Sequence, residues 1–149
     1  MADNNGIQVL SNDIHTITAE INAYQRVAGE AIFEIGRRLK HVKENDLAHG
    51  EFGKWVETIG VNRYDASRFI RVYDELGGSE LSTYANFGLN ALNLIATLPE
   101  SERNQSHTTA KGEQKKPEDM TVRELRDLKR QLKAERANKI KIFAISSIL

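Results

Sequence analysis

The amino-acid sequence predicts an all-α fold: a long N-terminal helix packed on a helix-turn-helix, then a short helix, a flexible linker and a basic C-terminal helix. Three observations predict it. Apolar residues recur in steps of three and four over long stretches, and runs of alternating apolar residues, which mark strands, are few. The 149 residues include only two prolines, and the ten glycines are spread along the chain. This length suits one ordinary domain, or one small domain with extensions.

The first predicted helix spans residues 14–42 and follows a flexible segment, residues 1–13. Oxygens of Ser11, Asn12 and Asp13 can accept hydrogen bonds from its first amides. At about 1.5 Å per residue the helix is about 40 Å long, more than a small three-helix core covers. Part of its apolar stripe is therefore expected to meet another surface. The stripe consists of Ile14, Ile17, Ile21, Tyr24, Ala28, Ala31, Ile32, Ile35, Leu39 and Val42.

The sequence of residues 51–76 predicts two helices joined by a turn that contains glycine, which is the pattern of a helix-turn-helix. Gly60 ends the first helix, Val61 fills the turn, and Asn62 caps the second helix. By helical spacing, four residues of the first helix and four of the second face inward. They are Phe52, Trp55, Val56 and Ile59, then Ala66, Phe69, Ile70 and Tyr73.

A short helix, residues 89–98, completes a helical domain over residues 14–99 and ends before Pro99. Residues 100–119 are polar and predict a flexible linker. In the C-terminal part, residues 120–149, Thr121 and Glu124 form a capping box for a basic helix. Between residues 121 and 141, basic residues outnumber acidic ones by eight to three. Leu125, Leu128 and Leu132 give this helix a narrow stripe that either docks or pairs weakly, and residues 140–149 form an apolar tail.

The overall charge excludes a strongly basic protein, since 21 lysines and arginines balance 21 aspartates and glutamates. Any surface for nucleic acid must therefore come from local segregation of charge. The chain has no cysteine, so disulfides and thiolate metal sites are excluded. We expect a bacterial cytoplasmic protein, because the N-terminus does not resemble a signal peptide and no segment is long enough to span a membrane.

An enzyme is not expected. His41, Asp46 and His49 are the one group that combines acid, base and possible metal ligands, but their spacing places no pair on one helical face. Solvated loop residues are the better interpretation. No phosphate-binding glycine loop or nucleophile elbow occurs, and no cofactor or metal is predicted.

The helix-turn-helix predicts contacts with double-stranded DNA. The first turns of its second helix would meet base edges through Arg63, Tyr64, Ser67 and Arg68. Phosphate contacts are expected from the basic residues around it, which are Arg37, Arg38, Lys40, Lys43, Lys54 and Arg71. The alternative is that these are ordinary solvated positions, because Asp65, Asp74 and Glu75 interrupt the positive face.

Residues 34–76 resemble an uncharacterised family of proteins carried by phages, prophages and plasmids, mostly of Gram-positive bacteria. Family members have a long helix ending in "IGRRL", an "HGEWGKWL" segment and a helix beginning near "TAQRFM". This chain has "IGRRL", "HGEFGKWV" and "DASRFI" in the same order. Phe52 replaces the usual tryptophan, and Asp65 replaces the threonine. The resemblance implies a mobile-element origin and a helix-turn-helix.

We therefore expect a DNA-binding protein that acts in phage or plasmid regulation or replication. A non-enzymatic adaptor or inhibitor that binds a host or phage protein is the alternative. A single recognition helix gives limited specificity for a DNA sequence, so a homodimer is expected. Its interface would comprise Ile14, Ile17, Ile21 and Tyr24, with help from Leu125, Leu128 and Leu132.

Overall fold

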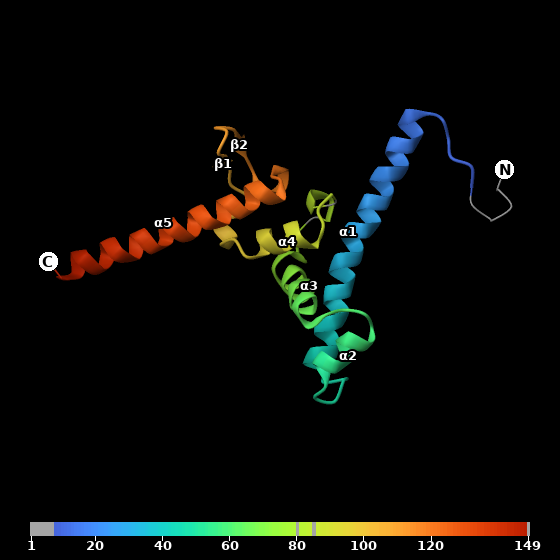
Figure 1. Ribbon diagram of the computed structural model, residues 1–149, viewed down its shortest axis with the longest axis horizontal. Coiled ribbons are helices and arrows are strands. Elements are labelled where there is room, and N and C mark those ends of the chain that lie inside the picture. Colours follow the sequence, from blue (N-terminus) through green and yellow to red (C-terminus); the bar gives the residue numbers. More distant parts are fainter. Residues whose placement is uncertain (1–7, 80, 85, 149) are drawn as a thin grey trace.

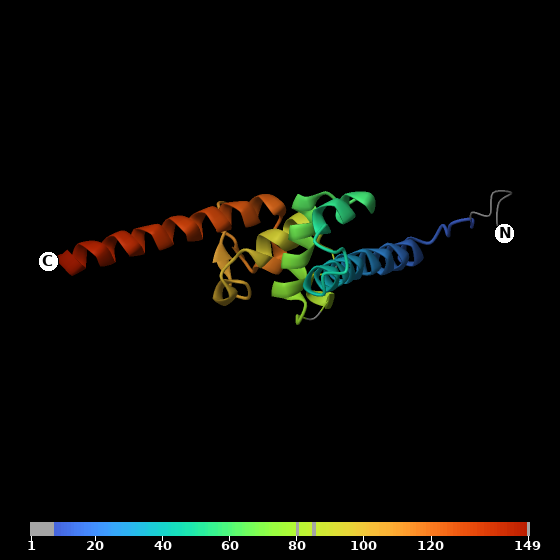
Figure 2. The same ribbon diagram turned by 90° about the horizontal axis from the view of Figure 1, so that it is seen from below.

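The structure, a computed structural model, describes residues 8–79, 81–84 and 86–148. Within them it is mostly helical, which confirms the predicted fold class. The helices are α1 (Ile14–Glu44), α2 (Phe52–Thr58), α3 (Arg63–Leu76), α4 (Leu89–Ala96) and α5 (Val122–Ile148). Most of the predicted flexible N-terminus, residues 1–7, lies outside the described residues. Figure 1 shows a central body from which the first half of α1 and the second half of α5 project in opposite directions, and Figure 2 agrees.

The helix caps form as the sequence predicts. Asp13 accepts hydrogen bonds from the amides of His15 and Thr16 at the start of α1. The side-chain oxygen of Asn62 accepts a hydrogen bond from the backbone amide of Asp65, at an N···O distance of 2.7 Å. Thr121 and Glu124 exchange side-chain and backbone hydrogen bonds, which completes the capping box of α5.

Helix α1 contacts α3 through a face that apolar periodicity does not reveal. Its buried residues are Gly29, Phe33, Gly36 and Leu39, whereas Ile35, predicted to face the core, is 39% exposed. The two helices approach so closely that a Cβ atom at Gly36 would overlap the carbonyl oxygen of Phe69. In the second half of α1 the predicted stripe is right at Leu39, which is buried, and at Ile32, which packs against the core, but wrong at Ala31 and Ile35, which are exposed. The periodicity missed Gly29 and Gly36, because glycine at a helix contact permits close packing and carries no apolar signal.

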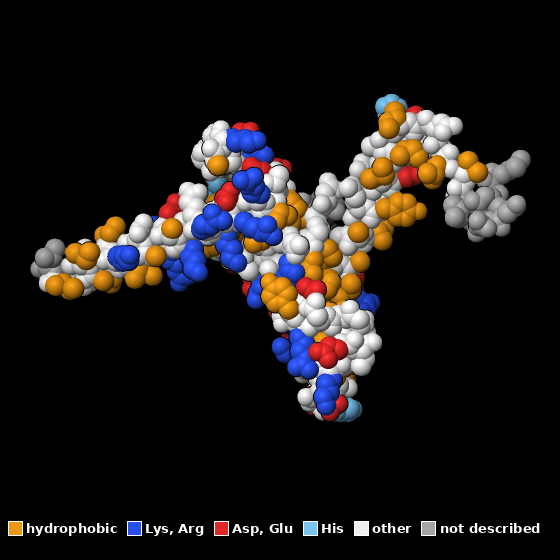
Figure 3. Space-filling model, viewed as in Figure 1, with side chains coloured by type: hydrophobic (Ala, Val, Ile, Leu, Met, Phe, Trp, Pro, Cys, Tyr) orange, Lys and Arg blue, Asp and Glu red, His pale blue; other side chains and the backbone are white. Residues whose placement is uncertain are grey.

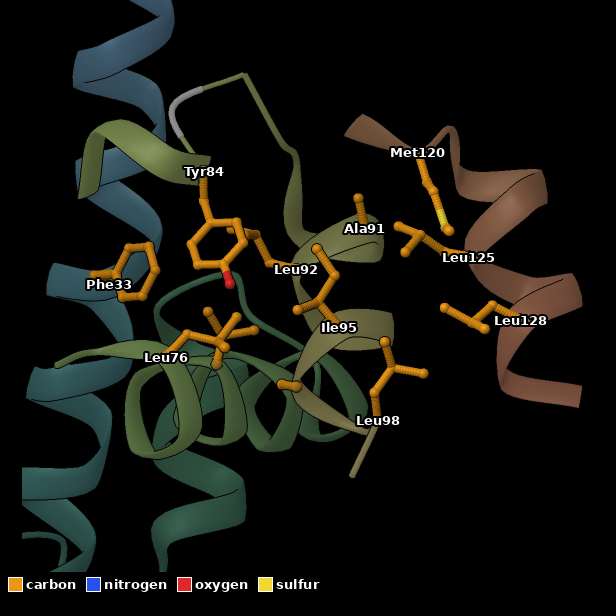
Figure 4. Close-up of a cluster of buried hydrophobic side chains, with 12 residues drawn as sticks. Phe33, Leu76, Tyr84, Ala91, Leu92, Ile95, Leu98, Met120, Leu125 and Leu128 are labelled. Atoms are coloured by element: carbon orange, nitrogen blue, oxygen red, sulfur yellow. The ribbon is translucent and has the colours of Figure 1, made fainter. Parts of the chain in front are cut away.

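Two clusters of apolar side chains form the core. The larger one joins α1, α3, α4 and the first half of α5, and it is shown in Figure 4. In it, Leu125 and Leu128 of α5 point toward Ile95 and Leu98, from α4 and the residues after it. The smaller cluster fixes α2 on α1 and α3. It contains Leu39, Val56 and Ala66, with Phe52, Trp55, Val61, Phe69 and Ile70 partly buried around them.

Of the predicted core positions in the first helix of the helix-turn-helix, Trp55 packs against the smaller cluster and Ile59 does not. Trp55 is only partly buried, at a ring distance of 5.9 Å from Phe52. Ile59 lies beyond the end of α2 and is half exposed. The helix ends one residue before its apolar pattern does, so Ile59, the last residue of the pattern, falls in the turn.

Residues 100–119 form ordered structure, which corrects the predicted flexible linker. They contain two 3-10 turns, Glu100–Glu102 and Pro117–Asp119, and a short antiparallel hairpin between β1 (His107–Thr108) and β2 (Gln114–Lys115). Pro117 is fully buried. The side chain of Arg103 is 10% exposed and donates to the carbonyl oxygens of Leu98 and Ala96 and to the Glu75 carboxylate. Polar composition concealed this order, because hydrogen bonds rather than apolar burial provide much of it.

Candidate nucleic-acid interface

The first turns of α3 are held in place by the turn that precedes them. Gly60 has a φ of +80°, a left-handed conformation that favours glycine. Val61 packs into the smaller cluster, and Asn62 caps α3. Asp65 accepts a hydrogen bond from the Asn62 amide group at 3.0 Å, so its carboxylate also belongs to the cap. The start of α3 is therefore a fixed and outward-facing helix end.

Three of the four predicted base-contacting residues lie on the exposed surface at this end. The side chain of Arg63 is 63% exposed, lies along Gly53 of α2 and donates to Glu57 at 3.2 Å. Tyr64 is 71% exposed. The Ser67 hydroxyl is exposed and donates back to the Arg63 carbonyl at 3.2 Å. An exposed ion pair such as Arg63–Glu57 is weak, so Arg63 can exchange it for another acceptor at small cost.

Arg68 does not lie on that surface, which corrects its predicted place. Its side chain is 13% exposed, pairs with Asp65 at 3.1 Å and donates to the side-chain oxygen of Asn90 in α4. The guanidinium also lies 5.1 Å from the centre of the Tyr64 ring. Five residues along a helix rotate a side chain by about 140°. Arg63 and Arg68 therefore point in different directions, and Arg68 connects α3 to α4.

Helix α4 supplies two residues of this region that sequence reasoning missed. Asn90 accepts from Arg68, and the buried Asn93 accepts from Arg71 at 3.0 Å. A signal was present in the sequence, since these two asparagines lie three apart in an otherwise apolar helix. Buried polar side chains need hydrogen-bonding partners, so such a pair indicates a polar contact across a helix interface.

Five of the six predicted phosphate-contacting residues lie near acidic or aromatic side chains, and the sixth, Arg71, donates to Asn93. Lys40 donates a hydrogen bond to Asp74, and this bond holds the pKa of Lys40 above its ordinary value. The Lys40 nitrogen also lies 3.6 Å from the Glu44 carboxylate. The nitrogen of Lys43 lies 5.8 Å from the centre of the Phe52 ring. Lys54 is 3.7 Å from Glu51. Arg37 and Arg38 both pair with Glu34, and hydrogen bonding to Arg38 lowers the pKa of that carboxyl.

Basic side chains gather at two places. A hollow of about 480 Å³ between α1 and α3 is lined by Arg37, Arg38, Lys40, His41, Glu44 and Tyr73. Figure 3 shows a second concentration of lysines and arginines where the hairpin meets the first half of α5. A groove of about 700 Å³ runs there, lined by the basic Lys111, Lys115, Arg123 and Arg130 and by the acidic Glu113, Glu124 and Asp127. Lys115 pairs with Glu113 and Glu124, and Arg130 pairs with Asp127, so the acidic residues offset much of the positive charge of the groove.

Of the residues considered for an enzyme, Asp46 and His49 lie in the loop after α1, and His41 lies in α1. Asp46 and His49 adopt positive φ angles of 48° and 52°, and the Asp46 carboxylate accepts the Gly50 amide at 2.7 Å. His41 lies on the surface of α1, beside Asn45. Asp46 thereby closes the turn between α1 and α2.

The predicted dimer residues fall into two groups. Ile14, Ile21 and Tyr24 are exposed, and Ile17 is partly exposed, on the half of α1 that projects from the body. The leucines of α5 are not available to a partner, which corrects their predicted role. Leu125 and Leu128 are buried against α4, and Leu132 packs at the margin of the same cluster. The leucine stripe docks within the chain because the apolar surface of α4 already lies beside it.

Comparison with known proteins places the chain in a family. The sequence profile of a family described as "Protein of unknown function (DUF3102)" matches residues 8–131. The chain belongs to this family. The matched residues extend from just before α1 to the last core residues of α5, so the family domain includes the hairpin and α4 as well as the helix-turn-helix. Neither a curated protein nor a solved structure matches the chain.

No helix among the described residues is long and apolar enough to cross a membrane.

Proposed function

We propose that the protein binds double-stranded DNA through the start of α3 and acts in the regulation or replication of a phage or plasmid in the bacterial cytoplasm. The observation that carries the proposal is the exposed end of α3 in a helix-turn-helix. There Arg63, Tyr64 and Ser67 face solvent while the opposite side of the helix is packed. The first residues of a recognition helix are those that meet base edges in the major groove.

The charge along α3 supports an orientation with its first turns toward DNA. Arg63 lies at the beginning of the helix, and Arg71 is exposed two turns later. The acidic residues Asp74 and Glu75 lie at the far end, where Lys40 and Arg103 pair with them. Phosphates would therefore meet the basic end first, and the acidic end would remain within the protein's own ion pairs.

In this arrangement Arg63 donates to a base and Tyr64 and Ser67 add apolar and hydroxyl contacts. Arg68 positions α3 against α4 rather than reading a base. Arg37, Arg38, Lys43, Lys54 and Arg71 contribute phosphate contacts, whose effect depends on salt and not on sequence. Lys40 contributes less, because it is half buried and bonded to Asp74.

Binding to a duplex selected from a random library tests the proposal. Fluorescence anisotropy over a salt series should give an affinity that falls linearly with the logarithm of salt concentration. Arg63→Ala should lose about 1 to 3 kcal/mol of binding free energy and relax the sequence preference. Arg26→Ala is the matched control, because it removes the same charge from the projecting half of α1. Selection that enriches no sequence, or equal affinities for the two variants, contradicts the proposal.

One observation favours a second function, that of an adaptor or inhibitor that binds a host or phage protein. The last turns of α5 expose several large apolar side chains outside the matched family domain. They are Ile140, Ile142, Phe143, Ile145 and Ile148. Exposed apolar patches of this kind mark interaction sites. Under this second function, Ile145→Asp abolishes partner binding and Arg63→Ala has no effect on it.

A homodimer is part of the proposed function, since two recognition helices would read a pseudo-palindromic site. Its support is the exposed apolar half of α1.

A further inference from the structure

Helix α1 has two different apolar faces. The face with Gly29, Phe33 and Gly36 packs against the body of the protein. A second face follows steps of three and four residues without interruption and comprises Ile14, Ile17, Ile21, Tyr24, Ala28, Ala31 and Ile35. We call this second face the α1 seam. The body packs against the first face only. The α1 seam is therefore not covered by any other segment of the described part of the chain.

Exposure along the α1 seam is high. Ile14 is 68% exposed and Tyr24 is 76% exposed; Ala28 and Ala31 are exposed, and Ile35 is 39% exposed even beside the body. Figure 3 shows apolar side chains along the projecting half of α1. A helix that carries such side chains in water needs a partner, because its helical stability comes mainly from packing of the apolar face.

The spacing of the α1 seam indicates what kind of partner covers it. A repeat of seven residues with apolar side chains at the first and fourth positions has a period of 3.5, which is the pattern of a helix in a coiled coil. A surface for a sheet or a loop has no reason to keep this register. The α1 seam keeps it for three heptads, over about 33 Å at 1.5 Å per residue. Its partner is therefore a helix of similar length.

The residues that flank the α1 seam favour a second copy of α1 as that helix. In coiled coils, charges at the flanking positions select the partner. One flank carries Glu20, Val27 and Glu34, whereas the other carries Thr18 and Gln25 and then Ile32, which packs against the larger cluster of the body. In a parallel pair the first flank faces the second, so Glu20 meets the partner's Gln25. Self-pairing then brings no like charges together, and nothing on the second flank selects a different, charged helix.

The position of the body leaves room for this pairing. Phe33 and Gly36, which hold α3 and the larger cluster, lie on the side of α1 away from the α1 seam. Two copies can therefore join along their α1 seams with both bodies on the outside. The α5 leucines do not take part in the interface, since Leu125 and Leu128 are buried in the chain's own core.

We propose that two copies of this chain form a parallel two-stranded coiled coil along the α1 seam. The inference rests on the homodimer of the proposed function and specifies its interface, but it does not depend on DNA binding. Both bodies then lie at the same end of the coiled coil. Their two α3 helices are therefore at that end as well, as a pair of recognition helices.

Sedimentation equilibrium of the full-length protein at micromolar concentration, without DNA, tests this interface. The wild type should be a dimer. Ile21→Asp should raise the dissociation constant about tenfold or more, since it buries a charge in the α1 seam. Two controls should remain dimeric: Ala19→Asp places the same charge on another face of α1, and Ile145→Asp places it on the apolar end of α5. Circular dichroism should show unchanged helix content in the two controls, and in Ile21→Asp a loss no larger than the projecting half of α1 accounts for.

Single cysteines report the orientation, because the chain has none of its own. In a parallel pair, Ile14→Cys and Tyr24→Cys should each form an intermolecular disulfide under mild oxidation. A monomeric wild type, a dimer unaffected by Ile21→Asp, or a dimer lost with Ile145→Asp overturns the proposal. A crosslink at Tyr24→Cys without one at Ile14→Cys overturns the parallel orientation. None of these results involves DNA, so failure here is distinct from failure of DNA binding.

Discussion

Arginines of the same helix have different surroundings, and these surroundings determine what each can do. Arg63 is exposed and pairs weakly with Glu57, whereas Arg68 is nearly buried and bonds Asp65 and Asn90. Arg103 is buried as well and bonds carbonyl oxygens at the end of α4. An exposed arginine can exchange its acidic partner for a phosphate or a base, but a buried one cannot leave without breaking the core.

Arg103 provides the first stability prediction. Arg103→Ala should lower the free energy of unfolding by about 2 kcal/mol, because it removes charge-assisted hydrogen bonds that join the segment after α4 to the end of α3. Arg130→Ala is the matched control. Arg130 is 78% exposed, and its ion pair with Asp127 is 3.6 Å long, so its loss should change stability little. Urea unfolding measures both, and equal effects would show that residues 100–119 are held by something other than Arg103.

Gly36 provides the second prediction. Gly36→Ala should destabilise the protein by about 1 to 3 kcal/mol, since the new methyl group overlaps the Phe69 carbonyl and must push α1 and α3 apart. Gly88→Ala introduces the same methyl group where no atom lies within 4 Å, and its backbone is extended, so only a small change is expected. Thermal unfolding of the two variants measures the difference. A neutral Gly36→Ala would mean that the two helices are not in close contact.

At the scale of elements, helix α5 begins with a capping box that is sensitive to pH. The Thr121 amide, with help from Lys115, holds the pKa of the Glu124 carboxyl below its ordinary value of 4.5. A lowered pKa in the folded state means that the carboxylate stabilises the fold above pH 4.5 and that this contribution is lost as pH falls through the folded pKa. The start of α5 should therefore loosen in acid.

Glu124→Gln tests this prediction, because glutamine can still accept the Thr121 amide but carries no charge. The variant should have a lower thermal midpoint than the wild type at pH 7, and the difference should shrink as the pH falls below 4.5. Glu30→Gln, at an exposed position near the middle of α1, is the control for the loss of one carboxylate. A wild-type advantage that persists unchanged at pH 3 contradicts the role of the carboxylate.

The elements also show how far the sequence predicts this structure. Caps and glycine turns depend on neighbouring residues, so Asp13, Asn62, Gly60 and the capping box of α5 were predictable. Contacts between distant residues were not. The face that α1 presents to α3 depends on glycines, and the order of residues 100–119 depends on hydrogen bonds of Arg103 to residues far along the chain.

The residues of the candidate nucleic-acid interface also differ in how well the sequence predicts their positions. Exposure of Arg63, Tyr64 and Ser67 follows from helical spacing around Ala66 and Phe69. The burial of Arg68 depends on where α4 lies, and no local pattern gives that position. The asparagines of α4 were a usable signal, since Asn90 and Asn93 interrupt an apolar helix and require polar partners.

At the scale of the whole molecule, the body carries the exposed end of α3, and two helices project from the body. Figure 1 shows the projecting half of α1 and the basic α5 leaving the body in opposite directions. The first carries the α1 seam, and the second carries most of the segregated positive charge. In the proposed function the α1 seam pairs two copies and the exposed end of α3 contacts bases, whereas the proposed phosphate contacts lie on α1, α2 and α3.

The position of α3 on DNA is the central claim, and affinity cleavage tests it most directly. Because the chain lacks cysteine, an iron chelate can be attached at Ser67→Cys alone, and separately at Lys133→Cys on α5. On the selected duplex, the Ser67 probe should cut within each half-site, and the Lys133 probe should cut only at its flanks. Cleavage by the Lys133 probe together with no cleavage by the Ser67 probe would contradict the account, because α5 rather than α3 would then lie on the DNA.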